Sequence, residues 1–126
     1  MAFLNPIDVL RQRSLRSGMK RVFSLAVLTA GSFVQYTRED AAIRGALQDY
    51  GEFNSMFVSN NSDEVIAVDL DFTTSKRTII PAHVIMTIDQ VSYLEFQVTN
   101  LSATDTTAGE VIITAINERP LSREAR

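Results

Sequence analysis

Alternation of apolar and polar residues with a period of two dominates the second half of this 126-residue chain. In an extended segment 65–72, one side would carry four apolar residues, Ile66, Val68, Leu70 and Phe72. The other side would carry Asp69 and Asp71. Since successive side chains of a strand point to opposite faces, the segment is expected to be a strand with one buried and one solvated face.

The same alternation returns in residues 93–99. Leu94, Phe96 and Val98 are expected to point inward. Glu95, Gln97 and Thr99 are expected to point outward. A slip of one residue would expose all three apolar side chains, so the register of this strand is well specified.

Three further runs are rich in β-branched or aromatic residues, at positions 55–59, 84–88 and 111–116. Polar turn-forming clusters separate the runs, at residues 60–63, 73–76, 89–90 and 102–105. Pro81 lacks a backbone donor and therefore belongs at a sheet edge or at the start of a strand. A dozen residues between turns is typical of a sandwich or barrel, so we predict a mainly β chain with an antiparallel, jelly-roll-like β-sandwich.

The first half of the sequence predicts one or two N-terminal α-helices. Asn5, Pro6 and Asp8 are typical of a helix start and Gly18 of a helix end, which gives a helix over residues 6–17. A second helix over residues 38–50 would be capped by the Thr37 hydroxyl and end before a glycine at position 51. Between the two, the apolar run 22–34 is expected to form a buried strand pair.

This apolar run follows a basic stretch and so imitates a secretory signal. Its thirteen residues are too few to span a bilayer as a helix, which takes about 20. We therefore expect neither a signal peptide nor a transmembrane helix.

Charge divides the chain unevenly. Residues 1–21 hold five basic residues against one acid, whereas residues 22–117 hold four basic residues against twelve acids. We expect a basic N-terminal helix or arm at residues 1–21 and a β-sandwich domain at residues 22–126, with the second helix inserted at about 38–50.

The sequence offers no constellation of catalytic residues. The chain has no cysteine, and its single histidine, His83, cannot form a two-histidine metal site within one chain, so a structural role is expected for it. The acids around Asp69 do not have the spacing of a calcium loop, and the scattered glycines form no phosphate-binding loop. We predict no catalytic, cofactor-binding or metal-binding residues and no enzymatic activity.

Two Asn-x-Ser sequons begin at Asn60 and Asn100. Both lie in segments where asparagine and serine favour turns for backbone reasons. The turn interpretation is therefore sufficient, and glycosylation need not be invoked.

The basic arm is the one feature with a functional interpretation. Its candidate assembly contacts are Arg11, Arg13, Arg16, Lys20 and Arg21. They would suit phosphates of nucleic acid, an anionic membrane or the acidic surface of a neighbouring subunit. The arm lacks interleaved aromatic residues and the body is acidic, which favours the neighbouring subunit, and a solvated helix face is the plain alternative.

Residues 60–117 contain the segments NNSDEVIAVDLDF and IIPAHVIMTIDQVSYLEFQVTNLSATDTTAGEVIITAIN. These segments resemble small β-sandwich virion structural proteins of bacteriophages and archaeal viruses. The resemblance implies a role in decorating a capsid or building a neck, tail or spike, and a location in the virion after synthesis in the host cytoplasm. No ligand-binding residue is implied.

Two classes of function follow from these observations. In the first, the protein is structural and oligomerises with copies of itself and with other virion proteins. In the second, it is a non-catalytic adhesion or carbohydrate-binding module that uses exposed aromatics, for which Tyr93 is the candidate.

Overall fold

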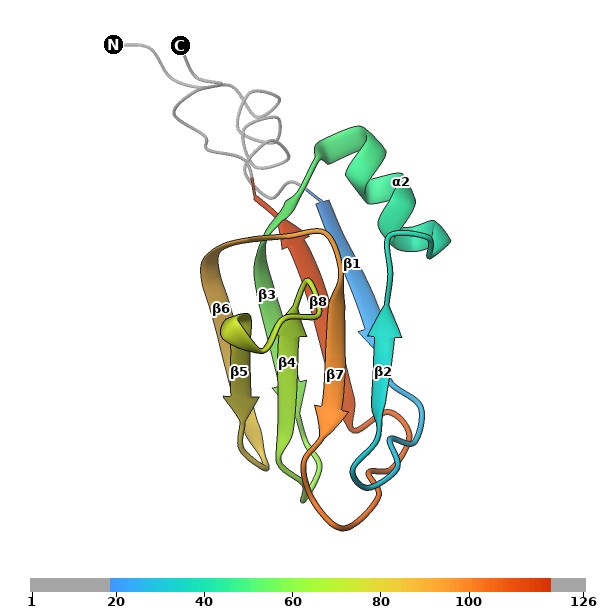
Figure 1. Cartoon of the computed structure of the whole chain (residues 1–126), viewed down its shortest axis with the longest axis vertical. Helices are drawn as coiled ribbons and strands as arrows, with labels where there is room; N and C mark the ends of the chain where they lie inside the picture. The colour runs from blue at the N-terminus through green and yellow to red at the C-terminus, as the bar shows by residue number, and fades with distance from the viewer. Residues whose placement is uncertain (1–18, 119–126) are drawn as a thin grey trace, which may run out of the picture.

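The alternating segments of the sequence form strands in two separate sheets. The computed structural model of the protein describes residues 19–118, which are mainly β (Figure 1). Sheet A has the order β1 (Met19–Ser24), β8 (Val111–Asn117), β3 (Phe53–Asn60) and β6 (Val84–Tyr93). Sheet B has the order β2 (Phe33–Tyr36), β7 (Phe96–Asn100), β4 (Ile66–Leu70) and β5 (Arg77–Ile80). All pairs within the sheets are antiparallel.

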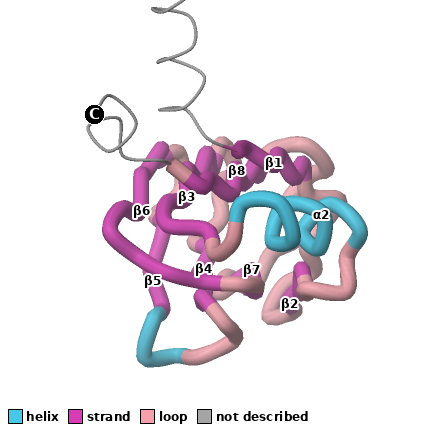
Figure 2. Tube along the Cα trace, turned by 90° about the horizontal axis from the view of Figure 1, so that it is seen from above, coloured by secondary structure: helices cyan, strands magenta, loops and turns pink. Residues whose placement is uncertain are grey.

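The chain crosses repeatedly between the two sheets. Every connection between consecutive strands passes from one sheet to the other except the link from β4 to β5, which contains the short 3-10 helix η1 (Thr74–Lys76). Viewed from above, the strands of sheet A form one layer and those of sheet B the other (Figure 2). Strands that are distant in sequence, such as β1 and β8, therefore become neighbours.

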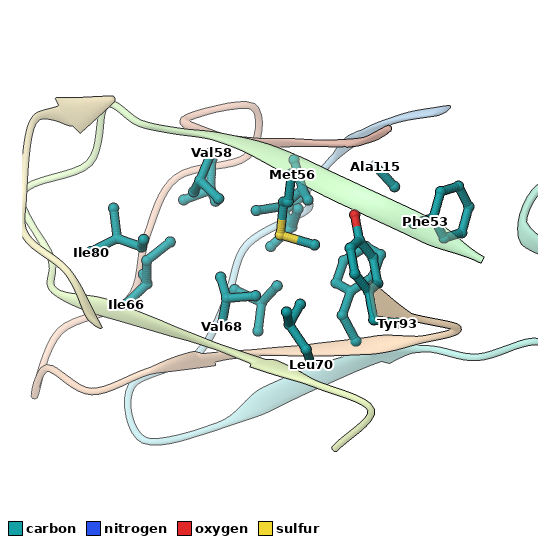
Figure 3. Close-up of a cluster of buried hydrophobic side chains, with 14 of the residues drawn as sticks. Phe53, Met56, Val58, Ile66, Val68, Leu70, Ile80, Tyr93 and Ala115 are labelled. Carbon is teal, nitrogen blue, oxygen red and sulfur yellow. The ribbon is translucent and has the colours of Figure 1, made fainter. Parts of the chain in front are cut away.

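The inward faces of both sheets share one hydrophobic core (Figure 3). Met56 and Val58 of β3 lie opposite Ile66 and Val68 of β4, as their alternation predicts. Aromatic rings join the sheets at one end of the core, where Phe23 of β1 contacts the Phe96 ring of β7 edge to face, with centroids 5.5 Å apart. The predicted inward positions of residues 66, 68, 70, 96 and 98 are confirmed, since all five side chains are buried.

Helix α2 (Ala41–Tyr50) lies at one end of the core, beside β1 and β2 (Figures 1 and 2). Its buried residues Ile43 and Ala46 are part of the core. The predicted helix is confirmed, but the cap is different: the Asp40 side chain accepts from the Ala42 backbone N–H, and the helix begins at Ala41. Thr37 instead forms a turn before the helix, where its hydroxyl accepts from the Glu39 backbone N–H.

Two fully buried asparagines tie loops to strand ends. The Asn60 side-chain amide donates to the carbonyls of Glu64 and Pro81, at 2.9 and 3.0 Å. The Asn100 amide donates to the carbonyls of Leu28 and Thr104, at 3.0 and 2.8 Å. Both sequon asparagines are therefore committed to backbone contacts inside the protein, in agreement with the turn interpretation.

The apolar run 22–34 differs from the expected strand pair. It contributes to β1 and β2, which lie in different sheets and do not pair with each other. Strand β1 also begins at Met19, so the expected boundary between residues 21 and 22 falls inside a strand. The basic residues Lys20 and Arg21 take up an extended conformation because β8 supplies a partner for the whole of β1.

Strand β4 is covered on both faces, which corrects its expected solvated side. Asp69 points away from the core, yet it is only 1% exposed because Arg77 of the neighbouring strand β5 lies beside it. The Arg77 guanidinium holds the Asp69 carboxylate through two bonds of 2.7 and 2.9 Å. Asp71 and Phe72 follow the end of β4 and adopt positive φ angles.

Two further expectations are wrong in this region. Tyr93, the candidate exposed aromatic, ends β6 and is buried against Phe53. Residues 89–90 form no turn: β6 continues through them, and Gln90 has a φ of 57° where the pairing with β3 shifts register. Leu94 precedes β7 and is only partly buried, and strand β5 was not anticipated.

The expected helix over residues 6–17 lies outside the described residues, as does most of the basic arm. Between residues 19 and 118, no helix is long and apolar enough to cross a bilayer.

Candidate assembly interface

The outward face of sheet A is almost free of charge. Cross-strand partners place twelve outward residues in three rows, each running through β1, β8, β3 and β6. The rows are Lys20, Ile116, Ser55 and Asp89; Val22, Thr114, Phe57 and Thr87; and Ser24, Ile112, Ser59 and Ile85. We call these twelve residues the A face.

Alternation along each strand determines which residues reach the A face. In β1 the Phe23 ring packs into the core. The preceding residue, Val22, therefore points to the opposite, outward face of the strand. In β3, Met56 and Val58 are buried in the core and Phe57 between them points out. Because directly opposed residues of paired strands share a face, the registers extend this assignment across the sheet.

Large apolar side chains on the A face are open to solvent. Val22 is 66% exposed, Ile85 61% and Phe57 39%. A sheet face that meets water usually carries charged or strongly polar residues. On the A face, only Lys20 and Asp89 are charged, and they occupy opposite ends of one row.

Sheet B has a different outward face. One row carries Gln35 hydrogen-bonded to Gln97 at 2.9 Å, followed by the ion pair of Asp69 with Arg77. Hydrogen bonding of the Arg77 guanidinium to the Asp69 carboxylate raises the pKa of Arg77. The polar groups of this row form hydrogen bonds with one another within the chain. Phe33 and Ile79 beside the row are exposed.

The predicted assembly contacts separate in the structure. Arg11, Arg13 and Arg16 lie outside the described residues. Lys20 is exposed at a corner of the A face, whereas the next residue in β1, Arg21, has the opposite orientation. Arg21 Nε donates to the Ala42 carbonyl at 3.2 Å, which ties β1 to α2.

The remaining candidate groups form small local contacts. His83 has a φ of 59° and lies on the surface, where its Nε2 is 2.6 Å from a carboxylate oxygen of Asp63. Across residues 19–118, no three histidine or acidic side chains are close enough to hold a metal ion. The pair links the loop after β3 to the turn before β6.

A small pocket opens between the β5 and β6 edges. Its volume is about 420 Å³, and Lys76, Arg77, Ile88 and Gln90 are among the residues that line it. Both cations already have acidic partners, since Lys76 lies 3.4 Å from Asp71 and Arg77 binds Asp69. The pocket lining contains no aromatic residue.

The A face was missed by sequence reasoning although a signal was present. The runs 84–88 and 111–116 have apolar or hydroxyl residues at every second position where a solvated strand would carry charges. Only the register shows that these positions adjoin Val22 and Phe57.

Comparison with known proteins identified no relatives: no family model matches the chain, and no curated protein or solved structure gave a significant match.

Proposed function

We propose that this protein is a non-catalytic structural component that assembles with copies of itself through the A face, within a virus particle. The exposed apolar side chains of the A face, which holds only two charged residues, support the proposal. Exposed apolar side chains that gather on one sheet face are a liability for an isolated protein and typically mark a site that a partner covers. On the A face, Val22, Phe57 and Ile85 are the most exposed apolar side chains.

The strand order supports the jelly-roll topology that we propose for this β-sandwich. Two sheets ordered β1, β8, β3, β6 and β2, β7, β4, β5 have the arrangement expected when two Greek keys share one core. Jelly rolls occur in viral capsid proteins, and also in lectins and cupins. Fold alone does not assign function, so the topology adds weight only together with the A face and the virion resemblance of residues 60–117.

The basic arm completes the proposal. The last residues of this arm, from Met19, belong to β1, where Lys20 lies at one corner of the A face. An arm with five basic residues would suit the acidic surface of a neighbouring subunit or of other virion proteins, as the charge of the body suggests. We propose that the arm, including its expected helix, makes further contacts with the neighbouring subunit beside the A face.

A carbohydrate-binding module is the competing function. It draws support from the pocket between β5 and β6, whose volume lies in the range of small-molecule sites. Sugar recognition typically relies on exposed aromatic side chains, and the burial of Tyr93 removes the candidate that the sequence suggested. The pocket cations are also neutralised by Asp69 and Asp71. The A face therefore favours assembly.

Sedimentation equilibrium of the full chain tests this function. We expect a mass that rises above one chain with increasing concentration, and a return to the monomer in Phe57→Glu, which places a carboxylate at the centre of the A face. Phe33→Glu is the matched control because Phe33 is an exposed aromatic on sheet B. A wild-type chain that stays monomeric, or equal effects of both variants, would contradict the proposal.

A further inference from the structure

The two charged residues of the A face have opposite sign and lie at opposite ends of the same row. Lys20 on β1 and Asp89 on β6 occupy the two ends of one row, with Ile116 and Ser55 between them. Three strand spacings of about 4.8 Å separate the ends by roughly 14 Å, so the two groups cannot pair within one chain. If a second copy faces this row in the reverse strand order, Lys20 of each copy lies opposite Asp89 of the other copy.

Side-chain size follows the same pattern. Apart from the charged ends of the first row, each position and its mirror position across the middle of the row hold one large apolar residue and one small hydroxyl residue. Val22 is matched with Thr87 and Phe57 with Thr114. Ile116 and Ser55, in the middle of the first row, are already buried within the chain, at 8% and 2% exposed, and add no surface for a partner. In the third row, Ile112 is matched with Ser59 and Ile85 with Ser24. Facing sheets interdigitate best when large side chains meet small ones.

From these observations we propose that two copies pack face to face through the A face, about a twofold axis that runs along the strands between β8 and β3. The inference rests on the proposed function and specifies its geometry. The axis places β1 over β6 of the other copy and β8 over β3. It puts Lys20 opposite Asp89 at both ends. It also puts each exposed large apolar residue of the face opposite a hydroxyl residue, which is the self-complementarity that an isologous interface requires.

The other twofold axis within the interface plane gives a poorer fit. Rotation about an axis perpendicular to the strands would stack Phe57 on its own copy and Thr87 on its own copy. It would also set Asp89 against Ile85, which leaves a desolvated carboxylate without a cationic partner. Volume and charge therefore favour the same orientation.

The size of the A face limits the strength of this contact. Four strands about 4.8 Å apart and five residues at about 3.4 Å give a footprint on the order of 300–400 Å² per copy. Stable interfaces of standard size bury about 800 Å² per partner. The pair formed by this face is thus a concentration-dependent contact that a larger assembly reinforces.

Charge reversal at the two ends of the row tests the orientation. In the full chain, Lys20→Glu and Asp89→Lys should each weaken dimerisation by about 10-fold, because two facing attractions become repulsions. The double variant should recover the affinity to within about 3-fold of the wild type, since opposite charges face each other again. Arg44→Glu on the exposed side of α2 is the control and should leave dimerisation unchanged.

Mixed single-cysteine variants provide an independent measurement. The chain has no cysteine, so a disulfide formed between Val22→Cys and Thr87→Cys proteins reports only on these positions. Oxidation of the mixture should give a crosslinked heterodimer, while each variant alone should crosslink far less, because positions 22 and 87 face each other across the proposed axis.

The outcomes separate the geometry from the function. A concentration-dependent dimer in which the double reversal gives no recovery and the mixture no preferential crosslink would overturn the proposed axis and leave assembly standing. A wild-type chain that is monomeric at all concentrations would overturn both proposals. Recovery together with selective crosslinking supports both.

Discussion

Replacement of Asn100 by aspartate tests how the loops are held to the two sheets. The Asn100 side chain is fully buried, and its amide nitrogen donates to the carbonyls of Leu28 and Thr104. Aspartate has nearly the same shape, but it presents an oxygen where the structure requires a donor. Two hydrogen bonds are therefore lost without any change of side-chain volume.

The magnitude follows from these contacts. Each hydrogen bond contributes about 1 kcal/mol net, and the buried carboxylate must either remain charged without a cation or take up a proton. The Leu28 carbonyl keeps the Thr106 backbone N–H as a donor, which limits the damage on that side. We expect Asn100→Asp to lower the free energy of unfolding by roughly 3–5 kcal/mol at neutral pH. For a domain of this size, this corresponds to a fall in Tm of about 10–20 °C.

The stability of the Asn100→Asp variant relative to the wild type should depend on pH. Burial would raise the pKa of the new carboxyl in the folded state above its unfolded value of about 3.9. The folded variant then binds more protons than the unfolded chain between these two values, so its stability relative to the wild type rises as the pH falls from 7 toward 4.

Thermal unfolding followed by circular dichroism measures this effect. Asn61→Asp is the matched control, because Asn61 is the exposed middle residue of the other sequon. The control should melt within about 2 °C of the wild type, as surface substitutions usually do. If Asn100→Asp melts as the wild type does at pH 7, the buried hydrogen bonds assigned to Asn100 do not hold the loop.

Substitutions at three further positions probe separate parts of the fold. Burial raises the pKa of the Tyr93 phenol, so the wild type should lose stability as the pH rises above about 10, where the unfolded tyrosine ionises first; Tyr93→Phe should show a shallower loss in alkaline urea titrations. Asp71 Oδ1 accepts from the backbone N–H groups of Leu94 and Glu95, so Asp71→Ala should lower the unfolding free energy by about 1–3 kcal/mol in urea denaturation, while Asp71→Asn retains an acceptor and should lose less. Gly51 ends α2 with φ 83° and ψ −159°, a conformation that L residues avoid, so Gly51→Ala should reduce stability by about 1–3 kcal/mol in the same assay; an unchanged midpoint would show that the helix end relaxes without strain.

Local patterns in the sequence were sufficient to identify most strands and their inward faces. The alternation around Val68 and Val98 specified which side chains enter the core, because a period of two leaves no other arrangement for a half-buried strand. Helix α2 was also predictable, since its apolar spacing and its terminal glycine are local features. These signals depend on neighbouring residues alone.

Features that depend on long-range pairing could not be predicted. The burial of Asp69 requires Arg77 on the adjacent strand, and nothing in the alternation of residues 65–72 indicates which strand lies beside it. Tyr93 was expected to be exposed because it precedes the inward residue Leu94 in the alternation of residues 93–99. In the structure Tyr93 instead ends β6, whose pairing with β3 shifts register, and β7 begins only at Phe96. Local periodicity cannot register such a shift.

The A face likewise combines local features that the sequence shows with long-range pairing that it does not. The hydroxyl and apolar character of Ile85, Thr87, Ile112 and Thr114 can be read along each strand, but their union into one face depends on the order of β1, β8, β3 and β6. The sequence directed attention to the basic arm, of which Lys20 alone is described on the A face.

The central claim is that another copy covers the A face. Methyl NMR of the full chain with a soluble paramagnetic agent measures this coverage at individual residues. The methyl of Ile85, on the A face, should lose solvent accessibility as protein concentration rises, while that of Ile79, exposed on sheet B, should remain accessible. An Ile85 methyl whose solvent accessibility stays the same at every protein concentration would contradict the account.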